Sequence, residues 1–222
     1  MDPIHLLLPT ASHTGLKLRP AWVGACFLPA GLGLGWQLWF CPTLSDSILA
    51  LGLLLGLLEQ AHMARVDLEK VKTLGQHPDY GLDPRLYRFA RVLMATLGTE
   101  LLGFYLASFG YLGVGLVVIM LSLLGFNLAA GVQLETGDRQ PIQAAPWHSR
   151  GLVLSLDGLG VAMGCLWLSG QGKLWVATGF LTLTLVYNLT KLINYGVKDR
   201  RTGAELTVKV TDPSQKQPET RQ

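Results

Sequence analysis

The chain has 222 residues, of which half are hydrophobic and only 15% are charged, and its formal net charge is +3. Soluble domains carry a charge on about a quarter of their residues, so this composition indicates an integral membrane protein with the lipid bilayer as its surroundings. No basic run is interleaved with aromatic residues, which excludes a typical nucleic-acid-binding surface.

Six apolar segments are long enough to cross a bilayer as helices, which takes about 20 residues. Short links join the first segment to the second, the third to the fourth and the fifth to the sixth. We therefore predict an all-α fold, a bundle of six transmembrane helices arranged as three helical hairpins. A proline stands near the start of each hairpin, at Pro20, Pro84 and Pro146. The predicted spans are 21–40, 45–64, 91–109, 112–134, 152–170 and 174–196.

The positions of Lys and Arg predict the orientation, because an excess of these residues marks cytoplasmic loops. Basic residues precede the first span, fill the link between the second and third, flank the link between the fourth and fifth, and follow the sixth. In the links on the opposite side only Lys173 is basic. Both termini are therefore predicted to be cytoplasmic, in a bacterial inner membrane or an equivalent internal membrane.

Three regions outside the spans are predicted to lie in the cytosol. Residues 1–20 form an N-terminal tail, because their short apolar run lacks the charge and cleavage site of a signal peptide. Residues 66–90 form a loop that first continues the second helix for a turn or two and then turns at PDYGLDP. Residues 197–222 form a polar tail that we expect to be disordered.

The cysteines predict no metal site. Cys26, Cys41 and Cys165 form no CxxC pair and no Cys/His cluster with zinc spacing. We expect three free thiols packed in the membrane, with a disulfide between Cys41 and Cys165 as the alternative, because both fall near the same membrane face.

Ionisable residues inside the predicted spans fall in the cytoplasmic halves. At a rise of 1.5 Å per residue, the main ones lie roughly 8–14 Å from the cytoplasmic helix ends. A charge at the centre of a bilayer costs at least about 2.5 kcal/mol, so such groups usually face the bundle interior or a partner. We expect Lys191 to pair with Glu59 or Asp157. The candidate polar cluster is Glu59, His62, Glu100, Asn127, Asp157, Asn188 and Lys191.

The sixth span supports an inward polar face directly. Its polar residues recur at spacings of three and four, which places them on one side of a helix. They are Thr184, Tyr187, Asn188, Lys191, Asn194 and Tyr195. Two interpretations stay open: a pocket open to the cytoplasm that binds a solute, a proton or a cofactor, or a hydrogen-bond and ion-pair network that only fixes the helices.

The stretch EQAHMAR, residues 59–65, resembles the E-x-x-H-x-R stretch with which light-harvesting helices ligate chlorophyll. Arg65 stands one residue later than that motif requires. The resemblance would imply a pigment or haem ligated by His62, and this is the one cofactor that the sequence suggests. We assign the chain to no family.

No catalytic motif is present: the sequence has no nucleophile elbow and no glycine-rich phosphate loop, so we favour a protein that is not an enzyme. Its small size and its Gly and Leu content favour an accessory or assembly subunit of a larger membrane complex, with other membrane proteins as partners. The alternative is a small membrane carrier, or a solute-binding transporter subunit, in which the polar cluster handles a solute or a proton. A membrane enzyme acting on lipid or quinone comes third.

Overall fold

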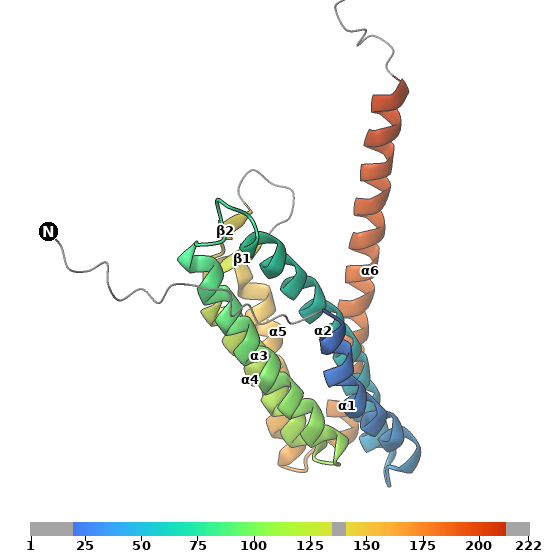
Figure 1. Ribbon diagram of the computed structural model, residues 1–222. Helices are drawn as coiled ribbons and strands as arrows, with labels where there is room; N and C mark the ends of the chain where they lie inside the picture. The colour runs from blue at the N-terminus through green and yellow to red at the C-terminus, as the bar shows by residue number, and fades with distance from the viewer. Residues whose placement is uncertain (1–19, 135–140, 212–222) are drawn as a thin grey trace, which may run out of the picture.

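The computed structural model describes residues 20–134 and 141–211, and this part of the chain is mainly helical. Its long helices form one bundle (Figure 1). They are α1 (Pro20–Phe40), α2 (Leu44–Gly75), α3 (Pro84–Ser108), α4 (Leu112–Ala129), α5 (Gly151–Leu168) and α6 (Lys173–Thr211).

Five of these helices, α1 to α5, are long and apolar enough to cross a membrane. These candidate spans support the membrane class predicted from composition. The helix α6 is not among the five, and most of its side chains beyond Lys191 lie outside the described residues. The sixth span and the orientation of the termini stay predictions.

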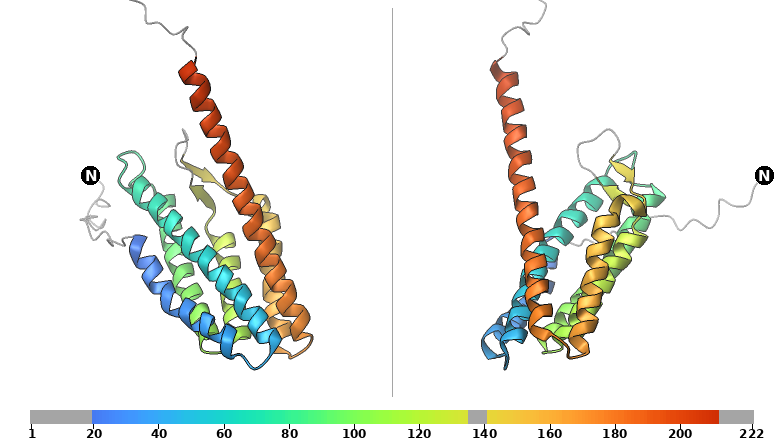
Figure 2. Two further views of the ribbon diagram at one scale, coloured as in Figure 1. Left: turned by 90° about the vertical axis from the view of Figure 1, so that its right-hand side faces the viewer. Right: turned by 180° about the vertical axis from the view of Figure 1, so that it is seen from behind.

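The helices pack as neighbours in two groups. The first group is α1, α2 and α6, in which α2 lies between the other two, and the second is α3, α4 and α5, in which α4 is central. The groups meet where α1 and α2 pack against α3. The contact between α5 and α6 is smaller, and α6 leans away from α5 toward its C-terminal end (Figure 2).

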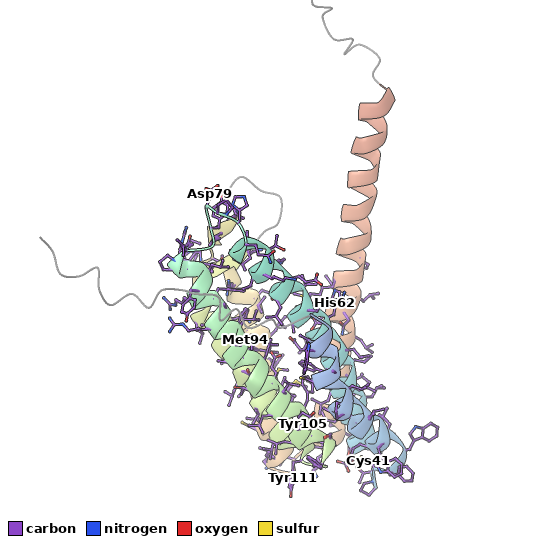
Figure 3. All side chains as sticks on the ribbon, viewed as in Figure 1. Cys41, His62, Asp79, Met94, Tyr105 and Tyr111 are labelled. Carbon is purple, nitrogen blue, oxygen red and sulfur yellow. The ribbon has the colours of Figure 1, made fainter. Side chains whose placement is uncertain are left out.

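The bundle has two distinct ends, which Figure 3 marks with Asp79 at one and with Cys41 and Tyr111 at the other. We call them the loop end and the turn end. The link 76–83 lies at the loop end, whereas the short links 41–43, 109–111 and 169–172 lie at the turn end.

Two helices begin earlier or end later than the predicted spans, for local reasons. The Asp83 carboxylate accepts a hydrogen bond from the backbone N–H of Arg85 at 2.8 Å, and Pro84 occupies the first turn, so α3 starts at Pro84 instead of 91. The helix α2 starts after Thr43, which accepts from the N–H of Asp46 at 3.2 Å. It runs to Gly75, which confirms the expected extension into the 66–90 loop and exceeds it.

The predicted fourth span, 112–134, is too long. The helix α4 ends at Ala129, and Gly131 follows with a φ of 65°, a left-handed conformation that breaks a helix and suits glycine. Val132–Leu134 (β1) then pairs antiparallel with Ile142–Ala144 (β2). In β1 the outer two residues are buried and Gln133 is exposed, the two-residue period of a strand. The fold therefore contains one small hairpin that the all-α prediction missed.

The last helix is the longest, and it continues past the predicted end of the sixth span to Thr211. Its C-terminal part projects beyond the rest of the bundle at the loop end (Figures 1 and 2).

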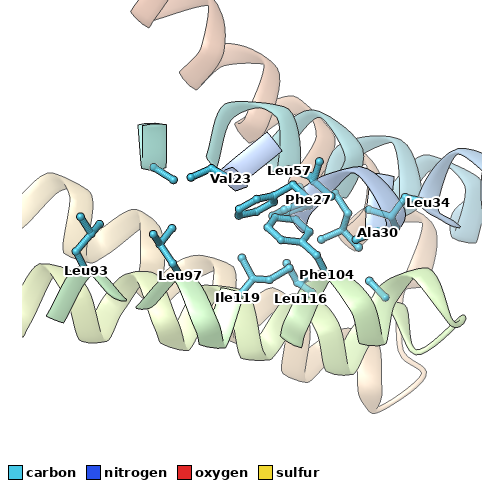
Figure 4. Packing of buried hydrophobic residues seen from close by; sticks show 14 of the residues in the cluster. Val23, Phe27, Ala30, Leu34, Leu57, Leu93, Leu97, Phe104, Leu116 and Ile119 are labelled. Atoms are coloured by element: carbon cyan, nitrogen blue, oxygen red, sulfur yellow. The ribbon is translucent and has the colours of Figure 1, made fainter. Parts of the chain in front are cut away.

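The apolar core lies where α1, α2, α3 and α4 meet (Figure 4). The rings of Phe27 and Phe104 pack edge to face at 5.9 Å between centroids. Beside them α3 and α4 touch through their backbones, because a Cβ placed on Gly115 would lie only 2.5 Å from the Gly103 carbonyl oxygen. Glycine is required there for the two helices to come this close.

All three cysteines are free thiols, as predicted, and the alternative disulfide is absent. Cys41, at the turn end, donates to the Gln37 side-chain oxygen at 3.1 Å. Burial, and then the nearby Asp46 carboxylate, raise the pKa of the Cys41 thiol.

Candidate functional site

A cavity of about 480 Å³ lies inside the bundle. Its walls come from α2, α3, α4, α5 and α6, with β1 closing one side, and it reaches from Phe104 and Phe180 in the core to Lys70 and Arg150 near the loop end. Most of the lining is aliphatic and aromatic. Polar side chains from every one of the five helices interrupt this lining.

Five of the seven predicted cluster residues line this cavity: Glu59, Glu100, Asn127, Asp157 and Lys191. They come from five different helices, so the fold brings together groups spread over most of the chain. His62 and Asn188 do not line it. His62 is exposed on α2, and the Asn188 amide donates to the Thr184 carbonyl oxygen on its own helix at 3.0 Å.

The first polar contact of the cavity is an ion pair between Lys191 of α6 and Glu59 of α2. Both side chains are mostly buried, at 24% and 11% exposure. The Lys191 ammonium also lies 4.9 Å from the centroid of the Tyr187 ring. Of the two predicted partners of Lys191, Glu59 and Asp157, it is Glu59 that forms the ion pair.

The second contact joins α4 to α5. The Asn127 amide donates to the Asp157 carboxylate at 2.8 Å. The Arg150 guanidinium donates to the Asn127 carbonyl oxygen at 3.3 Å and to the Val132 carbonyl oxygen at 2.8 Å. Arg150 therefore satisfies the Asn127 carbonyl in the last turn of α4, a group that a helix end leaves without a partner, and joins α4 to β1.

Glu100 differs from the other acidic groups of the cavity. It is only 2% exposed, and its Oε2 atom is fully buried with no hydrogen-bond partner among the described residues. Glu59 and Asp157 both interact with it electrostatically. A buried carboxyl group without a partner is costly, so this position calls for a proton or for a donor supplied from outside the described chain.

The charges of the lining do not balance. It contains four acidic residues, Glu59, Asp67, Glu100 and Asp157, and three basic ones, Lys70, Arg150 and Lys191. Lys191 pairs with Glu59, and the Lys70 ammonium lies 3.6 Å from the Asp67 carboxylate. Arg150 donates to the carbonyl oxygens of Asn127 and Val132. Glu100 and Asp157 are left without a cationic partner within residues 20–134 and 141–211.

The sequence missed several polar residues of the lining. Asp67 and Lys70 were assigned to the cytosolic loop, but they lie eight and eleven positions after Glu59 on the same helix and so share its face. A longer prediction for α2 would have found them. In the sequence, Arg150 is only one of the basic residues that flank the link between the fourth and fifth spans and indicate the orientation. Thr96, which lies four residues before Glu100 on α3, was not singled out.

The described residues contain no group of three His, Cys, Asp or Glu side chains arranged to hold a metal ion. No protein-family model matches this chain, and comparison with the curated proteins and with the solved structures found no significant match. The site must therefore be interpreted from its own chemistry.

Proposed function

We propose that this protein binds a small organic solute inside the membrane, as a small carrier or as the solute-binding subunit of a transporter. The observation that supports this best is Glu100, a carboxyl group that is buried, lines the cavity and lacks a partner in the described chain. A bound solute with a hydrogen-bond donor would supply the missing partner.

The cavity has the properties of a ligand site. Its volume of about 480 Å³ lies within the range of about 300–1,000 Å³ typical of small-molecule pockets. Such pockets combine apolar walls with a few polar groups that orient the ligand. Here the polar groups would be Glu100, Asp157 and the Lys191–Glu59 pair. In our proposal the loop end faces the cytoplasm, because the basic residues of the links gather there.

The test is to identify small molecules that remain bound to the protein after gentle purification, by extraction and mass spectrometry. We expect a compound that the wild type retains and Glu100→Gln loses. Glu69→Gln is the matched control, because Glu69 lies on α2 with a side chain 49% exposed and does not line the cavity. The same set of compounds in all three proteins, or none, would refute the proposal.

The second candidate is an accessory or assembly subunit of a larger membrane complex. The observation that favours it is the C-terminal part of α6, whose backbone extends past the bundle (Figure 1). A native gel of the solubilised protein separates the candidates. Stoichiometric partner proteins in a large band would favour the subunit, whereas a small band with this chain alone would favour the carrier.

A further inference from the structure

We infer that the cavity takes an amphiphile from the bilayer, with an amine head at Glu100 and a hydrocarbon chain that leaves between α5 and α6. This inference rests on the proposed function and names the class of ligand.

The head group follows from the charges of the lining. Glu100 and Asp157 lack a cationic partner, while the basic side chains of the lining are already engaged. An ammonium group brings one positive charge and several N–H donors, so it can satisfy the Glu100 carboxylate directly. An anionic head would instead lie beside Glu100 and Asp157, the two acidic residues without a cationic partner, which disfavours phosphate or carboxylate ligands.

The hydrocarbon chain of the ligand is inferred from the apolar part of the lining. Around the polar groups stand large apolar side chains from several helices that the protein itself buries only in part, among them Met63, Leu123, Phe126, Leu156 and Leu183. A small hydrophilic amine would leave this surface uncovered, whereas a hydrocarbon chain would be buried against it. The ligand that fits both parts of the cavity is therefore amphiphilic.

The route follows from the contact between α5 and α6. The cavity is lined from α5 by Val153 and Leu156 and from α6 by Leu183 and Tyr187. Val153 is 36% exposed and Tyr187 is 39% exposed, and α5 and α6 make only a small contact, so we place the opening of the cavity between these two helices. Figure 2 shows α6 leaning away from α5 on this side.

Lipid is the expected surroundings of this opening. The helix α5 is one of the five apolar enough to span the membrane, and large apolar side chains flank the opening on both helices. Leu152 on α5, next to Val153, is 76% exposed, and Val186 on α6, next to Tyr187, is 56% exposed. An opening bordered by such residues admits a molecule that is dissolved in the bilayer.

The experiment uses the full chain in phosphatidylcholine nanodiscs and two probes, dodecylamine and propylamine. The readout is the thermal unfolding midpoint as a function of probe concentration. We expect dodecylamine to raise the midpoint of the wild type and propylamine to have no effect at the same concentration. Glu100→Gln should weaken dodecylamine binding about tenfold or more, as loss of a charge-assisted contact does.

A second pair of variants tests the route. Val153→Trp fills the opening and should also weaken dodecylamine binding about tenfold. Leu166→Trp, at a 50% exposed position near the turn end of α5 that does not line the cavity, should leave binding unchanged. If Val153→Trp lowers the unfolding midpoint without a probe, the smaller Val153→Phe replaces it.

The outcomes separate this inference from the proposed function. Equal stabilisation by propylamine would overturn the amphiphile and leave a water-soluble amine as the solute. Equal stabilisation of the wild type and Glu100→Gln by dodecylamine would overturn the head-group assignment. The proposed function itself fails only if purified protein retains no compound that depends on Glu100.

Discussion

Lys191 of α6 and Glu59 of α2 form an ion pair although 132 positions separate them in the chain. The pair joins the last helix to the second at the edge of the cavity, and α6 makes only a small contact with α5 on its other side. It therefore helps to hold α6 against α2.

Lys191→Met removes this pair and leaves the Glu59 carboxylate without its cation. We expect a loss of about 1–3 kcal/mol in the free energy of unfolding, the cost of leaving a buried polar group unsatisfied. The measurement is denaturant unfolding in mild detergent. Arg65→Met is the matched control, because it breaks the exposed Arg65–Glu69 pair, whose side chains are 64% and 49% exposed. Its effect should stay below about 1 kcal/mol, and equal losses in both variants would contradict the account.

Gly115→Ala tests the close contact of α3 and α4. The added Cβ would lie 2.5 Å from the Gly103 carbonyl oxygen and 2.7 Å from the Ala107 Cβ, so the helices must separate. We expect the free energy of unfolding to fall by about 1–3 kcal/mol, as in other overpacked cores. Thermal unfolding measures this loss. Gly125→Ala on the same helix meets nothing within 4 Å. It should be neutral or stabilising by up to about 1 kcal/mol, and a loss equal to that of Gly115→Ala would refute the helix-contact explanation.

Asp83 gives a pH-dependent prediction at the start of α3. Hydrogen bonds from the Arg85 side chain and backbone hold the pKa of the Asp83 carboxyl below its ordinary value. A lowered pKa in the folded state means that ionised Asp83 stabilises the fold above its unfolded pKa of about 3.9. This contribution is lost as the pH falls through the lower folded value.

Asp83→Asn keeps a capping side chain but removes the charge. The wild type should therefore unfold at a higher temperature than Asp83→Asn at neutral pH, and the difference should shrink as the pH falls below about 4. Thermal scans between neutral pH and pH 3 test this. A difference that does not change with pH would show that the charge of Asp83 contributes nothing.

The orientation is tested by cysteines at the two ends of the bundle. In a background with the three native cysteines replaced by Ala, Asp79→Cys marks the loop end and Tyr111→Cys marks the turn end (Figure 3). A membrane-impermeant maleimide should label Tyr111→Cys from outside intact cells and Asp79→Cys only in inverted vesicles. The reverse pattern would place the cavity's loop end outside the cytoplasm.

Composition and hydropathy were enough to predict the membrane class and the approximate positions of the helices that could span it. The prolines at 20 and 84 also marked helix starts, since a proline needs no N–H partner in the first turn. The end of α4 was missed because Val132 and Leu134 are as apolar as the helix before them. Only Gly131 and the alternation of VQL distinguish this strand from the helix.

The candidate site could be predicted in part. The rule that polar and ionisable groups in a membrane face the interior selected five residues that line one cavity. The same rule selected His62, which the structure exposes, because helical spacing alone cannot fix which face of α2 packs inward. The pairing of Lys191 with Glu59, and the lack of a partner for Glu100, depend on contacts between distant helices that no local pattern contains.

The measurement that tests the central claim most directly is the accessibility of the cavity in native membranes. In the cysteine-free background, Leu183→Cys and Leu185→Cys form a matched pair on α6. Leu183 lines the cavity, whereas Leu185 does not line it and is 49% exposed. A small cationic thiol reagent, 2-aminoethyl methanethiosulfonate, should modify Leu183→Cys several times faster, because the acidic cavity attracts a cation that the lipid-facing position does not. Equal rates, or faster modification at 185, would contradict a polar cavity inside the bundle.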